Sequence, residues 1–262
     1  MKRPLSIFLI LASGLLGCPG SQPRPDDPNA PGGDKAHENA TIQFSLGAND
    51  QASGNVRQAL AEYQQALVYD PNYPEAENAL GLLYHLSFRQ LDESEKHYLQ
   101  ALKLKPDYAS AKNNLAALYT YLGRYDDCVR LEEEVLKDLQ YKGGFLAANN
   151  EGWCLFKKGD IAHGLPLIQE AVRVNPEFCQ GYRNLGLIYA DQNKLDLAET
   201  ELDRMVKKCP DAAQGYYELG KVQLRLGKAP DAVHNFGICR DRAKEGDPLL
   251  DECTRLEKGG KP

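Results

Sequence analysis

Cysteine and histidine are among the residue types in this chain that could ligate a metal ion or take part in catalysis. The 262 residues include seven cysteines and five histidines, the latter at His37, His85, His97, His163 and His234. No two histidines stand four residues apart, no Cys-x-x-Cys pair occurs, and the chain has neither a nucleophile elbow nor a phosphate-binding glycine loop. These spacings predict a protein that is not an enzyme and that uses no metal, cofactor or small-molecule substrate.

The first cysteine, Cys18, has a different chemistry open to it. A positively charged start precedes an apolar run over residues 5–16, which is too short to span a bilayer as a helix. The run ends in Leu-Leu-Gly-Cys at Cys18, which is similar to a bacterial lipobox. Cleavage after residue 17 and lipidation of the Cys18 thiol are therefore expected. The alternative is an ordinary signal peptide with a chance cysteine.

The segment after Cys18 lacks the composition of a folded core. Residues 19–33 read PGSQPRPDDPNAPGG, with five prolines and no large apolar residue. We expect residues 18–38 to form a tether between the membrane and a folded body. Without residues 1–17 the chain has 29 basic and 37 acidic residues, a net charge of −8, and no basic cluster. This balance argues against a nucleic-acid partner.

The folded body repeats itself with a period near 34 residues. Prolines end amphipathic stretches at Pro71, Pro106, Pro176 and Pro210. Leu-Gly pairs recur in the same register at residues 46–47, 80–81, 185–186 and 219–220, with Leu-Ala at 115–116. Small residues follow about twelve positions after the glycine, and aromatic or large aliphatic residues lie four positions after the small ones. A small residue on each of two antiparallel helices lets their backbones approach closely.

This pattern resembles the tetratricopeptide (TPR) repeat and predicts an all-α solenoid. We expect about six repeats over residues 39–244, with a capping helix over 245–258 and a tail over 259–262. The second repeat carries one extra residue between its helices, and the third lacks its proline. The expected repeats begin near Ala40, Pro74, Ala109, Phe145, Cys179 and Ala213.

The other six cysteines are even in number, which suggests disulfides in an exported protein. The two ends of an antiparallel helix pair meet, which favours a bond between Cys179 and Cys209. Cys239 lies late in the sixth repeat and faces the capping helix, which carries Cys253. A third expected pair is Cys128 with Cys154, and the alternative is that some of these residues are buried thiols.

The first helices of successive TPR repeats line an inner groove, reached by the second, fifth, ninth, twelfth and thirteenth places of each repeat. The fifth places hold three asparagines in succession, which could bond a bound peptide's backbone because an amide both donates and accepts. Apolar groove residues include the only tryptophan, Trp153, which in this register is not part of the packing between helices. The expected groove residues are Asn78, Leu82, Leu86, Asn113, Tyr121, Asn149, Trp153, Phe156, Arg183, Leu187 and Tyr217.

A lipobox, a proline-rich tether and six TPR repeats together resemble the Tgl/PilF/PilW family of type IV pilus lipoproteins. The local matches are AENALGLLYHL, KNNLAALYTYLGRYDDC and FLAANNEGWCLFKKGDI, and the resemblance covers most of residues 40–245. The cysteines near the C-terminus are most similar to Tgl. The resemblance implies a pilotin, anchored by lipid in the outer membrane with its body in the periplasm. Its partner would be the pilus secretin, whose targeting and multimer assembly support pilus-dependent motility.

A second hypothesis fits the same repeats, because TPR folds serve many partners. The protein could be an adaptor for outer-membrane protein insertion or for peptidoglycan enzymes. A neighbouring block of pilus genes would favour the first hypothesis, and co-purification with wall hydrolases or the insertion machinery would favour the second.

Overall fold

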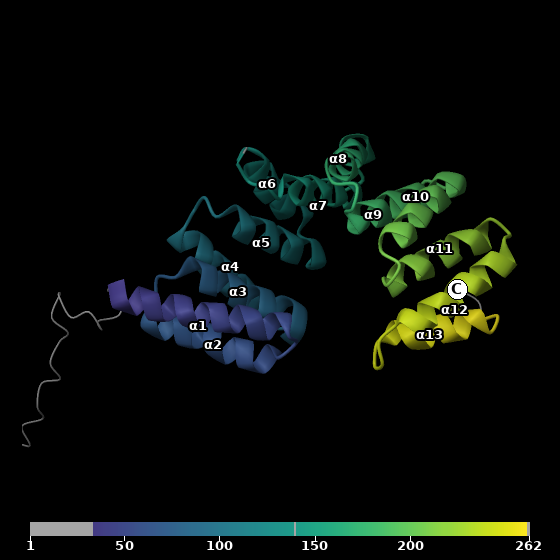
Figure 1. Cartoon of the computed structure of the whole chain (residues 1–262). Coiled ribbons are helices and arrows are strands. Elements are labelled where there is room, and N and C mark those ends of the chain that lie inside the picture. The colour runs from purple at the N-terminus through teal and green to yellow at the C-terminus, as the bar shows by residue number, and fades with distance from the viewer. Residues whose placement is uncertain (1–33, 139, 261–262) are drawn as a thin grey trace, which may run out of the picture.

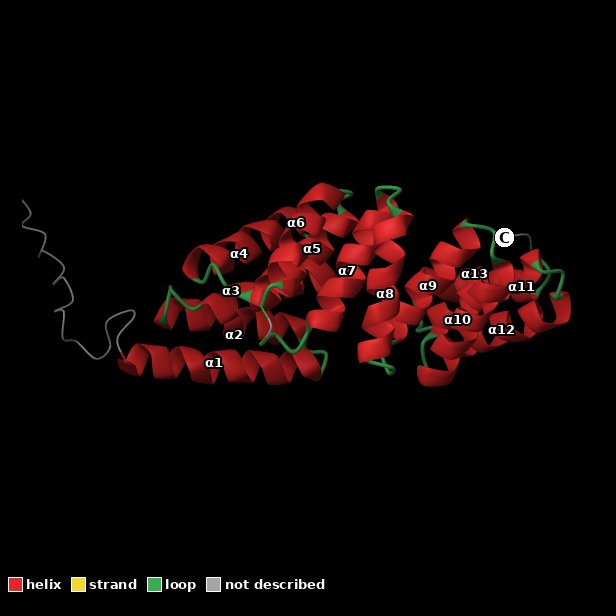
Figure 2. Ribbon diagram, turned by 90° about the horizontal axis from the view of Figure 1, so that it is seen from above, coloured by secondary structure: helices red, strands yellow, loops and turns green. Residues whose placement is uncertain are grey.

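The computed structural model describes residues 34–138 and 140–260. Over these residues the chain is an arch of helices that runs from α1 at one end to α13 at the other (Figure 1). No strand occurs in this part of the chain (Figure 2). The expected signal peptide, the lipidated Cys18 and the tether up to residue 33 lie outside the described residues.

Six antiparallel helix pairs, which we call repeats 1 to 6, make up the arch, and they confirm the predicted α-solenoid. The first helices are α1 (Asp34–Ala52), α3 (Pro74–Leu83), α5 (Ala109–Tyr121), α7 (Gly144–Lys157), α9 (Cys179–Asp191) and α11 (Ala213–Arg225). The second helices are α2 (Val56–Tyr69), α4 (Leu91–Leu104), α6 (Tyr125–Leu136), α8 (Ile161–Val174), α10 (Leu195–Lys208) and α12 (Ala229–Arg242). From α5 onward the first helices lie on the inner side of the arch and α6, α8 and α10 on the outer side (Figure 1).

The two helices of a repeat approach closely at the glycine of the Leu-Gly pair. A Cβ atom on Gly81 would lie 2.6 Å from the ring of Tyr98, and one on Gly186 would lie 2.6 Å from Leu202. Ser94 is fully buried opposite Gly81, and its hydroxyl donates to the Gly81 carbonyl over 2.8 Å. Only residues without a bulky side chain permit this spacing.

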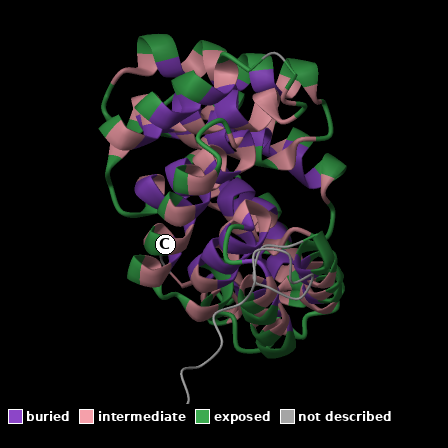
Figure 3. Ribbon diagram, turned by 90° about the vertical axis from the view of Figure 1, so that its left-hand side faces the viewer, coloured by how far each residue is buried: buried purple, intermediate pink, exposed green. Residues whose placement is uncertain are grey.

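The hydrophobic core runs between the two rows of helices (Figure 3). One buried cluster includes Ile168 of α8, Leu202 of α10 and Val222 of α11, so it joins repeats 4, 5 and 6. Each repeat therefore covers the apolar face of its neighbour. None of the helices formed by the described residues is long and apolar enough to cross a membrane.

The last helix, α13 (Pro248–Glu257), closes the core of repeat 6. Leu256 packs with Phe236 in a buried cluster, and the Asp247 side chain caps the helix by accepting from the Leu249 amide over 2.9 Å. The helix is slightly shorter than the expected span of 245–258, because Gly246 adopts a positive φ of 82° immediately before the cap.

The first helix begins at Asp34, so the expected tether boundary at residue 38 is wrong by five residues. Ala36 and Ala40 are buried against the second helix of repeat 1 and its neighbours. The His37 ring lies 2.6 Å from the Asp70 carboxylate and contacts Tyr73 edge-on. These contacts give residues 34–38 a packed environment that their composition does not reveal.

The extra residue of repeat 2 is accommodated by a turn of π-helix, η1 (Tyr84–Phe88), that continues α3. After it Arg89 adopts the left-handed conformation, with φ 56° and ψ 29°. The corresponding turns of other repeats place Gly54, Gly123 or Gly227 there, all with positive φ. A side chain with a Cβ atom is strained in this conformation, whereas glycine is not.

Three disulfides join the six cysteines of the described residues. Cys128–Cys154 connects α6 to α7, Cys179–Cys209 spans repeat 5, and Cys239–Cys253 connects α12 to α13. These are the three pairs expected from the sequence. Two of the bonds join consecutive repeats or a repeat to its cap.

We predict that Arg89→Gly raises the free energy of unfolding by about 0.5–1 kcal/mol, because relief of left-handed strain outweighs the flexibility that glycine adds to the unfolded chain. Urea unfolding followed by circular dichroism measures the change. Ser87→Gly, at an exposed helical position two residues away, is the control and should lower stability. A destabilised Arg89→Gly variant would contradict the strain argument.

Candidate functional site

The candidate site is the inner face of the arch, which we define by the second, fifth, ninth, twelfth and thirteenth places of the first helices. Leu86 and Tyr121 occupy the thirteenth place in repeats 2 and 3, with 58% and 61% of their surfaces exposed. Leu82, Trp153, Phe156, Leu187 and Tyr217 are half-buried. The inner face of repeats 2 to 4 therefore exposes apolar side chains, which is typical of an interaction surface.

Tyr121 lies beside the turn of π-helix in the preceding repeat. Its ring contacts the ring of His85 edge-on, with centroids 6.2 Å apart. Burial of His85 and, to a smaller extent, the charge of Arg89 lower the pKa of the imidazole. His85 is consequently a neutral aromatic support for Tyr121 at pH 7.

Trp153 is part of the packing between repeats, so the expectation that it stands apart from the helix contacts is wrong. Its indole packs on the buried cluster of repeats 4 to 6 and on Phe156, with ring centroids 5.2 Å apart. The ninth place of α7 faces the neighbouring α9 as well as the inner face, because successive repeats are stacked closely. Truncation of Trp153 would therefore affect stability together with binding.

The asparagines at the fifth places already use their side-chain oxygens in bonds between repeats, which narrows their expected role to donation by the amide NH2 groups. Each accepts a hydrogen bond from an asparagine at the sixth place of the next repeat, and Asn149 is only 2% exposed. We call these hydrogen bonds between successive repeats the ladder. Asn114 donates to Asn78 over 3.0 Å, Asn150 to Asn113 over 3.0 Å, and Asn184 to Asn149 over 2.9 Å.

The same ladder ends in an ion pair between repeats 5 and 6. Arg183, at the fifth place of α9, donates to Glu218 at the sixth place of α11 over 3.3 Å. The sixth-place residues were not among those expected from the sequence. The doubled asparagines at residues 113–114 and 149–150 were the signal, because identical pairs one repeat apart can bond to each other.

Two glutamates are buried beside the ladder at the junction of repeats 3 and 4. Glu132 is fully buried, and one of its oxygens accepts from the Asn150 amide over 2.9 Å. Burial raises the pKa of Glu132 well above its usual range, against the opposing effect of the Asn150 bond. The run Glu132-Glu133-Glu134 reads as a solvated helix face in sequence, but only Glu133 and Glu134 are exposed.

Glu151 is the second buried acid of this junction, at a place where TPR repeats usually carry leucine. Burial raises its pKa to about 7, and the nearby charge of Glu133 adds to the shift. One oxygen of each of Glu132 and Glu151 has no hydrogen-bond partner among the described residues. Both carboxyl groups therefore favour the neutral form, which costs less to bury.

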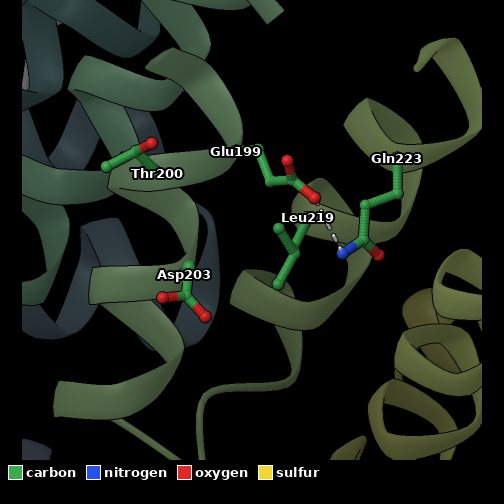
Figure 4. Close-up of a pocket in the computed structure, with 5 residues that line it drawn as sticks. All are labelled: Glu199, Thr200, Asp203, Leu219 and Gln223. Atoms are coloured by element: carbon green, nitrogen blue, oxygen red, sulfur yellow. Dashed lines mark hydrogen bonds between the residues drawn. The ribbon is translucent and has the colours of Figure 1, made fainter. Parts of the chain in front are cut away.

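The described residues show no constellation for catalysis or metal binding. No group of three or more His, Cys, Asp or Glu side chains in that part of the chain could hold a metal ion. A surface pocket of about 250 Å³ lies between α10 and α11, lined by Glu199, Thr200, Asp203, Leu219 and Gln223 (Figure 4). The Glu199 carboxylate in it accepts from Gln223 and from Lys228. None of the expected binding residues lines this pocket.

Family comparisons agree with the fold. Tetratricopeptide-repeat models match residues 51–87, 75–108, 109–140 and 149–213. Together they cover more than half of the chain, which therefore belongs to the tetratricopeptide-repeat proteins.

Solved structures with the same arrangement of repeats include two proteins of type IV pilus biogenesis. The crystal structure of PilW, a widely conserved type IV pilus biogenesis factor, has a TM-score of 0.70 and 21% identity over 82% of this chain and 98% of PilW. PilF of Pseudomonas aeruginosa has a TM-score of 0.65 and 17% identity over 85% of this chain and 99% of its own.

A tetratricopeptide repeat protein from Parabacteroides merdae is equally similar in fold, with a TM-score of 0.71 and 16% identity over 84% of this chain and 85% of its own. At such identities the likeness establishes a shared repeat architecture over nearly the whole of PilW and PilF.

The buried Glu151 should make the free energy of unfolding depend on pH. Its pKa is 4.5 in an unfolded chain and about 7 in the folded protein, so the folded state binds the proton more tightly. The resulting stabilisation is complete below pH 4.5 and is lost as the pH rises to 7. The difference between these two pKa values corresponds to at most about 3.5 kcal/mol. Because solvent screens part of the effect, we predict that Glu151→Gln removes about 1–2 kcal/mol of this dependence.

Urea unfolding at pH 5, 6, 7 and 8 measures the effect as the difference between the wild type and the variant. Glu38→Gln, an exposed change on α1, is the control and should follow the wild type. Parallel stability curves for Glu151→Gln and the wild type would show that Glu151 is ionised in the folded protein.

Proposed function

We propose that this protein is an outer-membrane lipoprotein that binds the type IV pilus secretin and promotes its targeting and multimer assembly. The observation that carries the proposal is the match of the helical body to nearly the full length of both PilW and PilF. The lipobox ending at Cys18 supports a lipid anchor, and the proline-rich segment after it would let the repeats stand off the membrane in the periplasm.

The protein would act by binding and not by catalysis. Repeats 2 to 4 present Leu86 and Tyr121 as exposed apolar side chains, with Leu82, Trp153 and Phe156 half-buried beside them. Because the fifth-place amide oxygens already accept bonds from the next repeat, we assign most of the contact energy to the apolar side chains. A lipid-held binding surface would also raise the local concentration of secretin subunits at the membrane.

We predict that Tyr121→Asp prevents secretin multimers from forming while the protein stays folded. Tyr121 is exposed, so the change places a charge in the contact without disturbing the core. Loss of a central aromatic contact typically costs about 2 kcal/mol, or about thirtyfold in affinity. A deletion strain complemented with the variant is assayed for heat-resistant secretin multimers by gel electrophoresis, and circular dichroism checks the fold.

Leu99→Asp is the matched control, because Leu99 is an exposed apolar residue on α4, a second helix of its repeat. It should support normal multimers. If the deletion strain itself forms normal multimers, the protein is not a pilotin. If Tyr121→Asp folds and multimers form normally, the inner face of repeats 2 to 4 is not the binding surface.

A further inference from the structure

The inner face changes character between its two ends. Repeats 2 to 4 present the exposed Leu86 and Tyr121 there, with a single cation, Lys157 at the thirteenth place of α7, whereas repeats 5 and 6 carry cations at three inner places. Arg183 holds the fifth place of α9, and Lys221 and Arg225 hold the ninth and thirteenth places of α11. The last two are four residues apart and therefore share one side of the helix.

One carboxylate serves two of these cations. Glu218 is buried, with 8% of its side chain exposed; one oxygen accepts from Arg183 over 3.3 Å and the other from Lys221 over 3.5 Å. The first oxygen also accepts from the Gln214 amide over 2.8 Å. The contacts of Glu218 fix Arg183 and Lys221 near each other and neutralise only one of the two charges.

The donors of this cluster outnumber its acceptors. An arginine carries five N–H groups and a lysine three. The Arg183 Nε is buried and has no hydrogen-bond partner among the described residues. Arg225 donates to the neutral amide oxygen of Asn193 over 3.1 Å, and the Lys221 ammonium lies 4.8 Å from the centre of the Tyr217 ring. Neither contact compensates a positive charge with a negative one.

The excess of positive charge is local. The chain as a whole has a net charge of −6. At the inner places of repeats 5 and 6, Arg183, Lys221 and Arg225 stand with two acids, Glu218 and the exposed Asp191. Glu252 of α13 also lies near Lys221, but it is paired with Arg255. A guanidinium group and an ammonium group held side by side suit carboxylate oxygens, which accept charge-assisted hydrogen bonds.

We propose that the inner face of repeats 5 and 6 is a binding site for an acidic segment of a protein partner. The Asp or Glu side chains of that segment bind Arg183, Lys221 and Arg225. The segment lies next to the apolar surface of repeats 2 to 4, and a single partner can occupy both. This cationic site does not depend on the identity of that partner, so it can be tested separately from binding to the secretin.

The test uses a fluorescein-labelled peptide of ten glutamates with an amidated C-terminus, and a matched peptide of ten glutamines. Fluorescence anisotropy at low salt should show binding of the glutamate peptide and not of the glutamine peptide. Raising the salt from 50 to 200 mM should weaken binding, because exposed charges are screened. Lys221→Glu/Arg225→Glu should lower the affinity at least about tenfold.

Lys103→Glu/Lys137→Glu makes the same change in net charge at exposed positions off the inner face and should bind as the wild type does. If both double variants lower the affinity for the glutamate peptide equally, the effect comes from the net charge of the protein alone, and the proposal is overturned. Equal affinity of the wild type for the two peptides would overturn it as well.

Discussion

The architecture depends on the close approach of two helix backbones within each repeat. Gly81 and Gly186 sit against Tyr98 and Leu202 at distances that exclude a Cβ atom. In repeat 4 both helices use glycine, and a Cβ on Gly152 would lie 2.6 Å from the carbonyl oxygen of Gly164. This contact fixes the rotation of each first helix about its own axis, and so decides which side chains reach the inner face.

Stacking of the repeats then determines which polar side chains bond to one another. Because fifth and sixth places of neighbouring first helices meet, their side chains bond to each other as a ladder from Asn78 to Glu218. The ladder satisfies buried amides and links consecutive repeats. Exposed or half-buried side chains remain at other inner places, and they are apolar at Leu86 and Tyr121 and cationic at Lys221 and Arg225. The disulfide between Cys128 and Cys154 holds the same stacking covalently at the middle of the arch.

The solenoid was predictable because its signals are local and repeated. Proline stops and Leu-Gly pairs each report on one helix pair, and the four copies of each signal, distributed over the six repeats, reinforce one another. Contacts across repeats were not predictable in the same way. The register places Asn149 on the inner side but does not show that Asn184 bonds to it. The burial of Glu132 depends on Asn150, which is 18 residues away and belongs to another repeat. The start of α1 likewise depends on the contact of His37 with Asp70.

We propose that the inner face formed by the first helices is the surface that binds the secretin. Hydrogen–deuterium exchange of the purified protein with and without the purified pilus secretin tests this directly. We expect slower exchange in peptides that cover residues 82–89, 117–123 and 153–158, and unchanged exchange in α4, α6 and α8. Protection confined to α4, α6, α8 or α10, or no protection at saturating secretin, would contradict it.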